Sequence, residues 1–267
     1  MKQRIISAFF GIILLIVVML CNHHVFNFAV VCISTMAVFE VIGALGIRNH
    51  RMMTVVSLFL PAAVMGTSYF SREYIYPVVF LYLAVLLLVM LFGHKNNSFN
   101  EVSKFFAATV MITISFIHLS YVRCMENGLI CVWLIFIGSW ITDTFAYFTG
   151  LAFGKHKLAP SISPKKTIEG SVGGIIGVTA IITAYSVICS NIMKLDVNIY
   201  AVIAIGLLSG VFSQLGDLCA SVIKRENGVK DFGKIMPGHG GVMDRFDSFL
   251  FVAPTVYYIL EIFPVFM

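Results

Sequence analysis

The chain has 267 residues, of which 59% are hydrophobic and only 12% are charged. A soluble domain carries about 25% charged residues, so this composition excludes a set of ordinary water-soluble domains and predicts one membrane domain. The formal net charge of +5 suits a protein that faces anionic lipid headgroups or phosphates. The six cysteines form no C-x-x-C pair and lie mostly in apolar runs, which argues against a zinc site or a disulfide framework.

Long apolar segments predict an all-α, polytopic integral membrane protein. A spanning helix needs about 20 apolar residues, and lipid offers the backbone no hydrogen-bond partners outside a helix or closed barrel. We expect about nine transmembrane helices, at residues 5–20, 25–45, 53–70, 75–92, 105–122, 128–149, 171–190, 199–220 and 246–265. Close glycine pairs, Gly173/Gly177 and Gly206/Gly210, predict tight packing between helices.

The basic residues predict the orientation, because Lys and Arg stay on the cytoplasmic side. With the N-terminus inside, only Arg72, Arg123 and Lys194 of the 18 basic residues fall outside. We therefore expect a cytoplasmic N-terminus and an external C-terminus. The first apolar segment follows Lys2 and Arg4 without a small-x-small cleavage site, so we expect it to be a retained helix rather than a signal peptide.

Two inside loops, near residues 150–170 and 221–245, are the longest polar stretches and are rich in Gly, Pro and Lys. We therefore divide the chain into N-terminal transmembrane helices at 1–125 and a catalytic transmembrane region at 126–267. The expected active site lies at the cytoplasmic face of the C-terminal half.

Acidic residues in membrane spans are costly and usually functional. The orientation brings Asp143, Asp217, Asp231, Asp244 and Asp247 to the inner side. Asp244 and Asp247 are three residues apart, which would put both on one face of the last span's first turn. Such carboxylates suit Mg²⁺, which binds one or two carboxylates and takes its other ligands from phosphates and water. We assign Asp217, Asp244 and Asp247 to this metal site; Glu40 and Asp143 have no assigned role.

Basic groups and glycines surround these carboxylates. Lys165, Lys166, Lys224, Arg225 and Arg245 are expected to contact phosphates. The run from Pro237 to Gly241 lets backbone N–H groups approach an anion beside a helix N-terminus. His239 either binds phosphate or only holds this loop. The combination predicts phosphate chemistry, while the absence of G-x-x-x-x-G-K-[ST] and G-x-G-x-x-G argues against a P-loop ATPase or a Rossmann cofactor site.

These motifs resemble the signature of the phosphatidate cytidylyltransferase family. The match consists of Ser221 to Arg225, Lys230-Asp231-Phe232-Gly233 and His239 to Asp247, with Met236 where Leu, Ile or Phe is usual. Similar stretches begin at Asp143, Gly154, Ser163 and Gly216. The resemblance covers residues 130–250 well, whereas the first four or five spans resemble the family only in hydropathy.

The resemblance implies transfer of the CMP moiety of CTP to phosphatidic acid, giving CDP-diacylglycerol and pyrophosphate for phospholipid synthesis, with Mg²⁺ required. It implies catalytic roles for Asp217, Lys224, Arg225, Asp244, Arg245 and Asp247, and substrate-binding roles for Lys165, Lys166, Ser221, Lys230, His239, Gly240 and Gly241. Its implied partners are CTP, phosphatidic acid, the lipid bilayer and a second copy in a homodimer, with no nucleic acid. The implied location is the cell membrane, as a multi-pass protein of the bacterial inner or plasma membrane.

Two alternatives are weighed against this interpretation. A CTP-dependent lipid kinase would need a base to remove the proton of a lipid hydroxyl, and the full signature argues against it. A transporter or channel would carry its ion-binding carboxylates near the midplane, in broken paired helices. Here the carboxylates are expected at the inner surface, beside polar loops.

Overall fold

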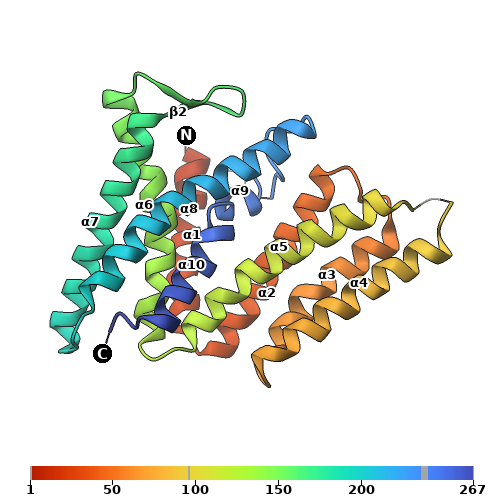
Figure 1. The fold of residues 1–267 in the computed structure, drawn as a ribbon, viewed down its shortest axis with the longest axis horizontal. Helices are drawn as coiled ribbons and strands as arrows, with labels where there is room; N and C mark the ends of the chain where they lie inside the picture. Colours follow the sequence, from red (N-terminus) through yellow and green to blue (C-terminus); the bar gives the residue numbers. More distant parts are fainter. Residues whose placement is uncertain (1, 96, 236–239, 267) are drawn as a thin grey trace. The chain divides into compact units, whose positions relative to one another are not determined.

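The computed structural model describes residues 2–95, 97–235 and 240–266, with side chains from Gly11 onward. Among these residues the chain is almost entirely helical (Figure 1). The helices are α1 Lys2–Leu20, α2 His23–Ala44, α3 Arg51–Thr67, α4 Ile75–Phe92, α5 Phe99–Arg123, α6 Gly128–Phe153, α7 Ile168–Met193, α8 Ile199–Glu226, α9 Met243–Phe246 and α10 Phe249–Ile262, with a 3-10 turn at Arg72–Tyr74. Two short strands, β1 Lys157–Ala159 and β2 Ser163–Thr167, form an antiparallel hairpin between α6 and α7.

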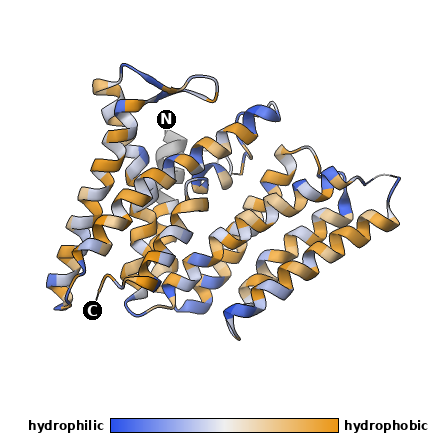
Figure 2. Ribbon diagram, viewed as in Figure 1, coloured by the Kyte–Doolittle hydropathy of each residue, from blue (hydrophilic) through white to orange (hydrophobic). Residues whose placement is uncertain are grey.

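In the part of the chain that the structure describes, six helical segments are long and apolar enough to cross a membrane. They are His23–Ala44, Arg72–Phe92, Phe99–Arg123, Gly128–Phe153, Ile168–Met193 and Ile199–Glu226. The other apolar segments, Gly11–Leu20, Arg51–Thr67 and Phe249–Ile262, are shorter. Figure 2 shows hydrophobic residues along most of each long helix and hydrophilic ones at the hairpin and the last turn of α8. The all-helical, polytopic architecture is therefore confirmed, and the count of nine crossings stays a prediction.

Many large apolar side chains point outward, as lipid-facing side chains do. Phe80 on α4 is 72% exposed, and Phe92 at its end is 85% exposed. Such a surface would be unstable in water, where large exposed apolar patches drive association. Lipid tails remove this penalty, so the exposed apolar surface agrees with a membrane setting.

The chain divides into two compact units, which are described separately. The first consists of residues 1–120 and 223–246, and the second of residues 121–222 and 247–267. In the first unit α2 packs against α3 and α9, and α3 against α4. The loop after α8 and the short helix α9 thus belong with the N-terminal helices.

The second unit has α6 and α7 side by side as its main contact (Figure 1). A Cβ on Gly177 of α7 would collide with the Phe145 ring, and one on Gly173 would collide with Thr149. On α8, a Cβ on Gly206 would lie 2.7 Å from the Thr179 Cα. The predicted close packing at both glycine pairs is therefore confirmed: a Cβ on Gly210 would lie 2.9 Å from the Ile175 Cα.

The start of the last apolar segment differs from the expectation. Helix α9 has only four residues and ends at Phe246, and α10 begins at Phe249. Asp247 lies in the turn between them, so it does not share a continuous helical face with Asp244. The prediction that both residues occupy the first turn of one spanning helix is wrong. Ser248 and Asp247 hydrogen-bond locally instead, in the way that short polar side chains compete with helical backbone bonds.

Candidate active site

In the first unit, Asp244 on α9 holds the connection between α8 and α9 in place. We call this connection the signature loop; its described residues are 227–235 and 240–242. The Asp244 Oδ1 atom accepts a hydrogen bond from the Lys224 ammonium at 2.9 Å. Its Oδ2 atom accepts from the backbone N–H groups of Phe232 at 2.8 Å and Gly241 at 3.0 Å. The Asp244 side chain is 5% exposed and that of Lys224 is 11% exposed. A buried charge needs such partners, because water no longer solvates it.

A cation–π contact and a glycine turn also shape this loop. The Lys224 Nζ atom lies 5.1 Å from the centroid of the Phe232 ring, within the range of a cation–π interaction. Gly240 has a φ of +85°, which favours glycine because an L side chain rarely adopts this conformation. The positive φ turns the chain so that the next N–H, that of Gly241, reaches Asp244. His239 lies outside the described residues, so its predicted role stays a prediction.

The other predicted residues of this unit lie at its surface. Arg225 lies in the last turn of α8, Arg245 lies on α9 and Lys230 lies in the loop between these helices, and all three are exposed. Exposed cations beside a backbone loop can attract a phosphorylated substrate, since Lys and Arg supply charge-assisted hydrogen bonds.

In the second unit, Asp217 is paired with Lys166. This ion pair joins β2 to α8, and the two side chains are 22% and 25% exposed. Ser221, one helical turn after Asp217, donates a hydrogen bond to its Oδ1 atom at 3.4 Å. Lys165 is exposed on the same strand. The structure therefore brings together three of the predicted residues, Lys166, Asp217 and Ser221, from elements about 50 residues apart in the chain.

The hairpin that carries Lys166 is fixed at its base by Glu169. The Glu169 carboxylate accepts hydrogen bonds from the backbone N–H groups of Lys155 and His156, at 3.1 Å and 3.2 Å. Thr167 caps α7 by accepting the Gly170 N–H at 3.1 Å. These bonds explain how a short polar segment holds one conformation despite its few apolar contacts.

Asp247 lies beside α8 and α6 in the same unit. Its backbone carbonyl approaches Gly216 so closely that a Cβ there would lie 2.7 Å from the oxygen. The Asp247 Oδ1 atom accepts the Ser248 N–H at 2.8 Å, and the Ser248 hydroxyl reaches Asp143 at 3.5 Å. Asp143 had no assigned role from the sequence, and the structure places it near Asp247 through Ser248.

A second residue without an assigned role, Glu40, also contacts the signature loop. It is 2% exposed, and its Oε2 atom accepts the Met243 N–H at 2.9 Å. The sequence signal for both residues is the same one, an acidic group within an apolar span. That signal does not identify the partner of either residue.

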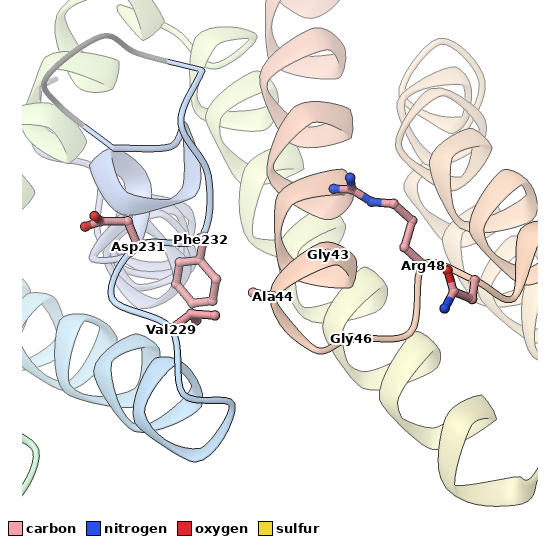
Figure 3. A pocket seen from close by; sticks show the side chains of 8 residues that line it. Gly43, Ala44, Gly46, Arg48, Val229, Asp231 and Phe232 are labelled. Atoms are coloured by element: carbon pink, nitrogen blue, oxygen red, sulfur yellow. The ribbon is translucent and has the colours of Figure 1, made fainter.

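A cavity of about 440 Å³ lies next to the loop in the first unit. The end of α2 and the α2–α3 connection line one side, including Ala44, Arg48 and Asn49, and the loop residues Val229, Asp231 and Phe232 line the other. Figure 3 shows Val229 and Phe232 directed toward Ala44, whereas the Asp231 carboxylate points away. The Arg48 guanidinium stacks over the Phe39 ring at 3.9 Å.

Within the described residues, no group of three or more His, Cys, Asp or Glu side chains is arranged to hold a metal ion. Mg²⁺ does not need such a group, because one or two carboxylates plus substrate phosphates and water are enough. The hard oxygens of Asp217 and Asp247 fit that requirement, Asp217 once its ion pair with Lys166 opens. Asp244 fits it only after Lys224 releases its Oδ1 atom, since the backbone occupies the other oxygen.

The sequence matches a known protein family along nearly its whole length. The model of the cytidylyltransferase family matches residues 2–263. The chain belongs to the cytidylyltransferase family. It is similar to a protein named phosphatidate cytidylyltransferase from Bacillus subtilis, with 33% identity over 98% of both chains. Proteins of the same name from Staphylococcus haemolyticus and Staphylococcus saprophyticus are 38% and 40% identical, each over 62% of this chain and 64% of the relative.

The family match extends well beyond the signature. It begins at residue 2, so the N-terminal helices, which resembled the family only in hydropathy, fall within the matched region. The N-terminal helices and the signature loop belong to one unit, in which α2 contacts α9. This contact is a structural reason for the family match to include the N-terminal helices.

Proposed function

We infer that this chain transfers the cytidylyl group of CTP to phosphatidate and forms CDP-diacylglycerol and pyrophosphate. The similarity to a phosphatidate cytidylyltransferase over 98% of both chains carries this conclusion. The phosphate-type chemistry of the loop residues supports it independently, because cations, carboxylates and a glycine turn occur together there.

The reaction we propose is an in-line displacement at the α-phosphorus of CTP. A phosphate oxygen of phosphatidate forms the new P–O bond, and the bond to the β-phosphate oxygen breaks as pyrophosphate leaves. A phosphate monoester is already mostly dianionic near pH 7, since its second pKa is about 6. No side chain of the protein therefore has to remove a proton. The main barriers are repulsion between two polyanions and the charge on the leaving group.

The basic side chains would reduce the repulsion between the two polyanionic substrates. We assign Lys224, Arg225 and Arg245 to substrate phosphates, together with Lys165 and Lys166 of the hairpin. Ser221 of the second unit, and Lys230 and the Gly240–Gly241 backbone of the first unit, are proposed as further substrate-binding residues. Their support is chemical: guanidinium and ammonium groups match phosphate oxygens, and glycines admit close backbone approach.

Asp217 and Asp247 of the second unit are the residues that would hold Mg²⁺, and the assignment of Asp244 to the same metal, made from the sequence, stays a proposal. When bound, the metal would orient the triphosphate and offset the charge of the leaving pyrophosphate. Asp143 supports this region by its contact with Ser248, which also binds Asp247. We therefore propose Asp143 as a further acidic residue of the site.

We also propose that the cavity beside Ala44 receives the nucleoside part of CTP. Its volume falls in the range of about 300–1,000 Å³ that is usual for small-molecule sites. Its lining combines the Phe232 ring with the polar side chains of Arg48 and Asn49. Such a mixture suits an aromatic base attached to a polar sugar.

The finer topology belongs to the same proposal. We propose nine crossings, a cytoplasmic N-terminus and an active site that faces the cytoplasm, supported by the distribution of Lys and Arg. That side supplies CTP, while the lipid arrives laterally in the bilayer. The homodimer that the resemblance implies remains a proposal too, and crosslinking in native membranes tests it.

The test is a CTP-dependent lipid-product assay with detergent-purified protein. We expect CDP-diacylglycerol from phosphatidate, with one pyrophosphate released per product. Formation of phosphatidate from diacylglycerol would instead identify the CTP-dependent kinase. Absence of any CTP-dependent lipid product, with a folded protein, would overturn the proposed function and favour a transporter.

A further inference from the structure

Glu40 is a buried acidic residue in the inner part of α2, far from the signature in sequence. It is 2% exposed and lies 203 residues before Met243, whose N–H it accepts at 2.9 Å. A carboxyl group buried in an apolar span is costly, so its position has to be compensated by specific contacts. The contact with Met243 is made to the backbone immediately before Asp244.

The Glu40 carboxyl group occupies a space that exists because two loop residues are glycines. A Cβ on Gly233 or on Gly241 would collide with its carboxyl atoms. Its Oε1 atom is buried without a hydrogen-bond partner among the described residues. The side chain is therefore enclosed by the loop backbone on both sides, and it is fixed by backbone hydrogen bonds from Met243 and Val242 and by close packing.

The same backbone holds Asp244. Gly241, which packs against the Glu40 carboxyl group, donates its N–H to the Asp244 Oδ2 atom at 3.0 Å. The neighbouring Gly240 has the positive φ that aims this N–H. A change in the position of the Glu40 carboxyl group would thus move the amides and the carboxylate assigned to CTP and its metal.

We propose that Glu40 is a positioning residue for the CTP site, which sets the backbone at Gly233 and at Gly240–Met243 from helix α2. This inference rests on the proposed function, in which that loop binds CTP. Because the carboxyl group is enclosed, it acts through the loop and does not touch the substrate. Its task is geometric, so an uncharged acceptor of the same shape should perform it.

Steady-state kinetics of Glu40→Ala and Glu40→Gln test the proposal. We expect Glu40→Ala to lower kcat/KM for CTP by about 10- to 100-fold, as loss of a supporting contact does. The KM for phosphatidate and the thermal melting midpoint should change little. Glu40→Gln keeps an acceptor for the Met243 N–H, so we expect it to retain most of the activity. A Gln variant as inactive as the Ala variant would overturn the proposal, because a charge would then be required.

If Glu40→Ala folds poorly, variants of the neighbouring glycines provide a second test of the proposal. Gly241→Ala alone should be nearly inactive, since its Cβ collides with Glu40. Glu40→Ala combined with Gly241→Ala removes the collision, so the double variant should regain the activity of Glu40→Ala alone, a coupling that independent sites do not show. Gly240→Ala is the matched control: its strain comes from φ, so Glu40→Ala should not relieve it.

The outcomes separate the two levels of inference. Wild-type protein without CTP-dependent lipid product would contradict the proposed function itself. Active wild type with no rescue of Gly241→Ala would overturn the role of Glu40 alone. Activity that falls only in proportion to the folded fraction, with both KM values unchanged, would likewise reduce Glu40 to a packing residue.

Discussion

Asp217 and Asp244 have similar local partners although they lie in different units. Each is paired with a lysine that we assign to phosphate, Lys166 in one case and Lys224 in the other. Asp244 additionally accepts two backbone N–H groups, which fix its rotamer. The Asp244 side chain is thus held in one orientation, whereas the contacts of Asp217 among the described residues are the ion pair with Lys166 and a long hydrogen bond from Ser221.

We predict that Asp217→Asn and Asp247→Asn each lower turnover by about 100-fold or more, because a hard cation loses a charged ligand that stabilises the leaving group. The measurement is turnover as a function of Mg²⁺ concentration, with melting curves to check folding. Asp196→Asn is the control, since that aspartate is exposed outside the two active-site regions. Near-normal turnover with the wild-type Mg²⁺ requirement would remove the altered residue from the metal site.

Among the helices, the glycines of α7 and α8 set how closely the second unit can pack. A Gly206→Leu variant should destabilise the fold by about 1–3 kcal/mol, because the added side chain overpacks the contact with Thr179. Gly66→Leu on α3 is the control, since nothing lies within 4 Å of a Cβ there. Thermal melting in detergent should show a lower midpoint for the first variant only. Equal midpoints would mean that the close approach contributes little.

The cavity between the α2–α3 connection and the signature loop can be tested by filling it with a larger side chain. Ala44→Phe should fill part of it and raise the KM for CTP at least about tenfold, with the KM for phosphatidate unchanged, because only one substrate loses binding area. Ala62→Phe, exposed on α3, is the matched control. A filled cavity with an unaltered KM for CTP would place the nucleoside elsewhere.

For the whole molecule, the distribution of basic residues predicts a C-terminus outside the cell. A reporter active only in the cytoplasm, fused after the last residue, should therefore be inactive, while the same reporter at the N-terminus should be active. The ratio of the two activities measures the orientation. Strong activity at the C-terminus would show that the count of crossings or the orientation is wrong.

The membrane helices could be predicted from the sequence because their apolar length reports directly on the lipid around them. The hairpin could not, since strands of three and five residues with lysines in them carry no alternating pattern. The break after Phe246 was hidden because Asp-Arg-Phe-Asp-Ser also fits an ordinary helix start. Glu40 could be noticed only as an acidic residue in an apolar span. Its partner Met243 lies 203 residues later in the sequence, so no local pattern predicts their contact.

The two lysine–aspartate pairs have a consequence for the enzyme between turnovers. A carboxylate neutralised by an ammonium group offers little attraction to a passing cation. On the proposed assignment, these two carboxylates would therefore attract divalent ions only weakly while CTP is absent. On binding, the phosphates of CTP would give both lysines new partners and would leave the carboxylates available to hold Mg²⁺. Idle and working forms would therefore differ by an exchange of counterions.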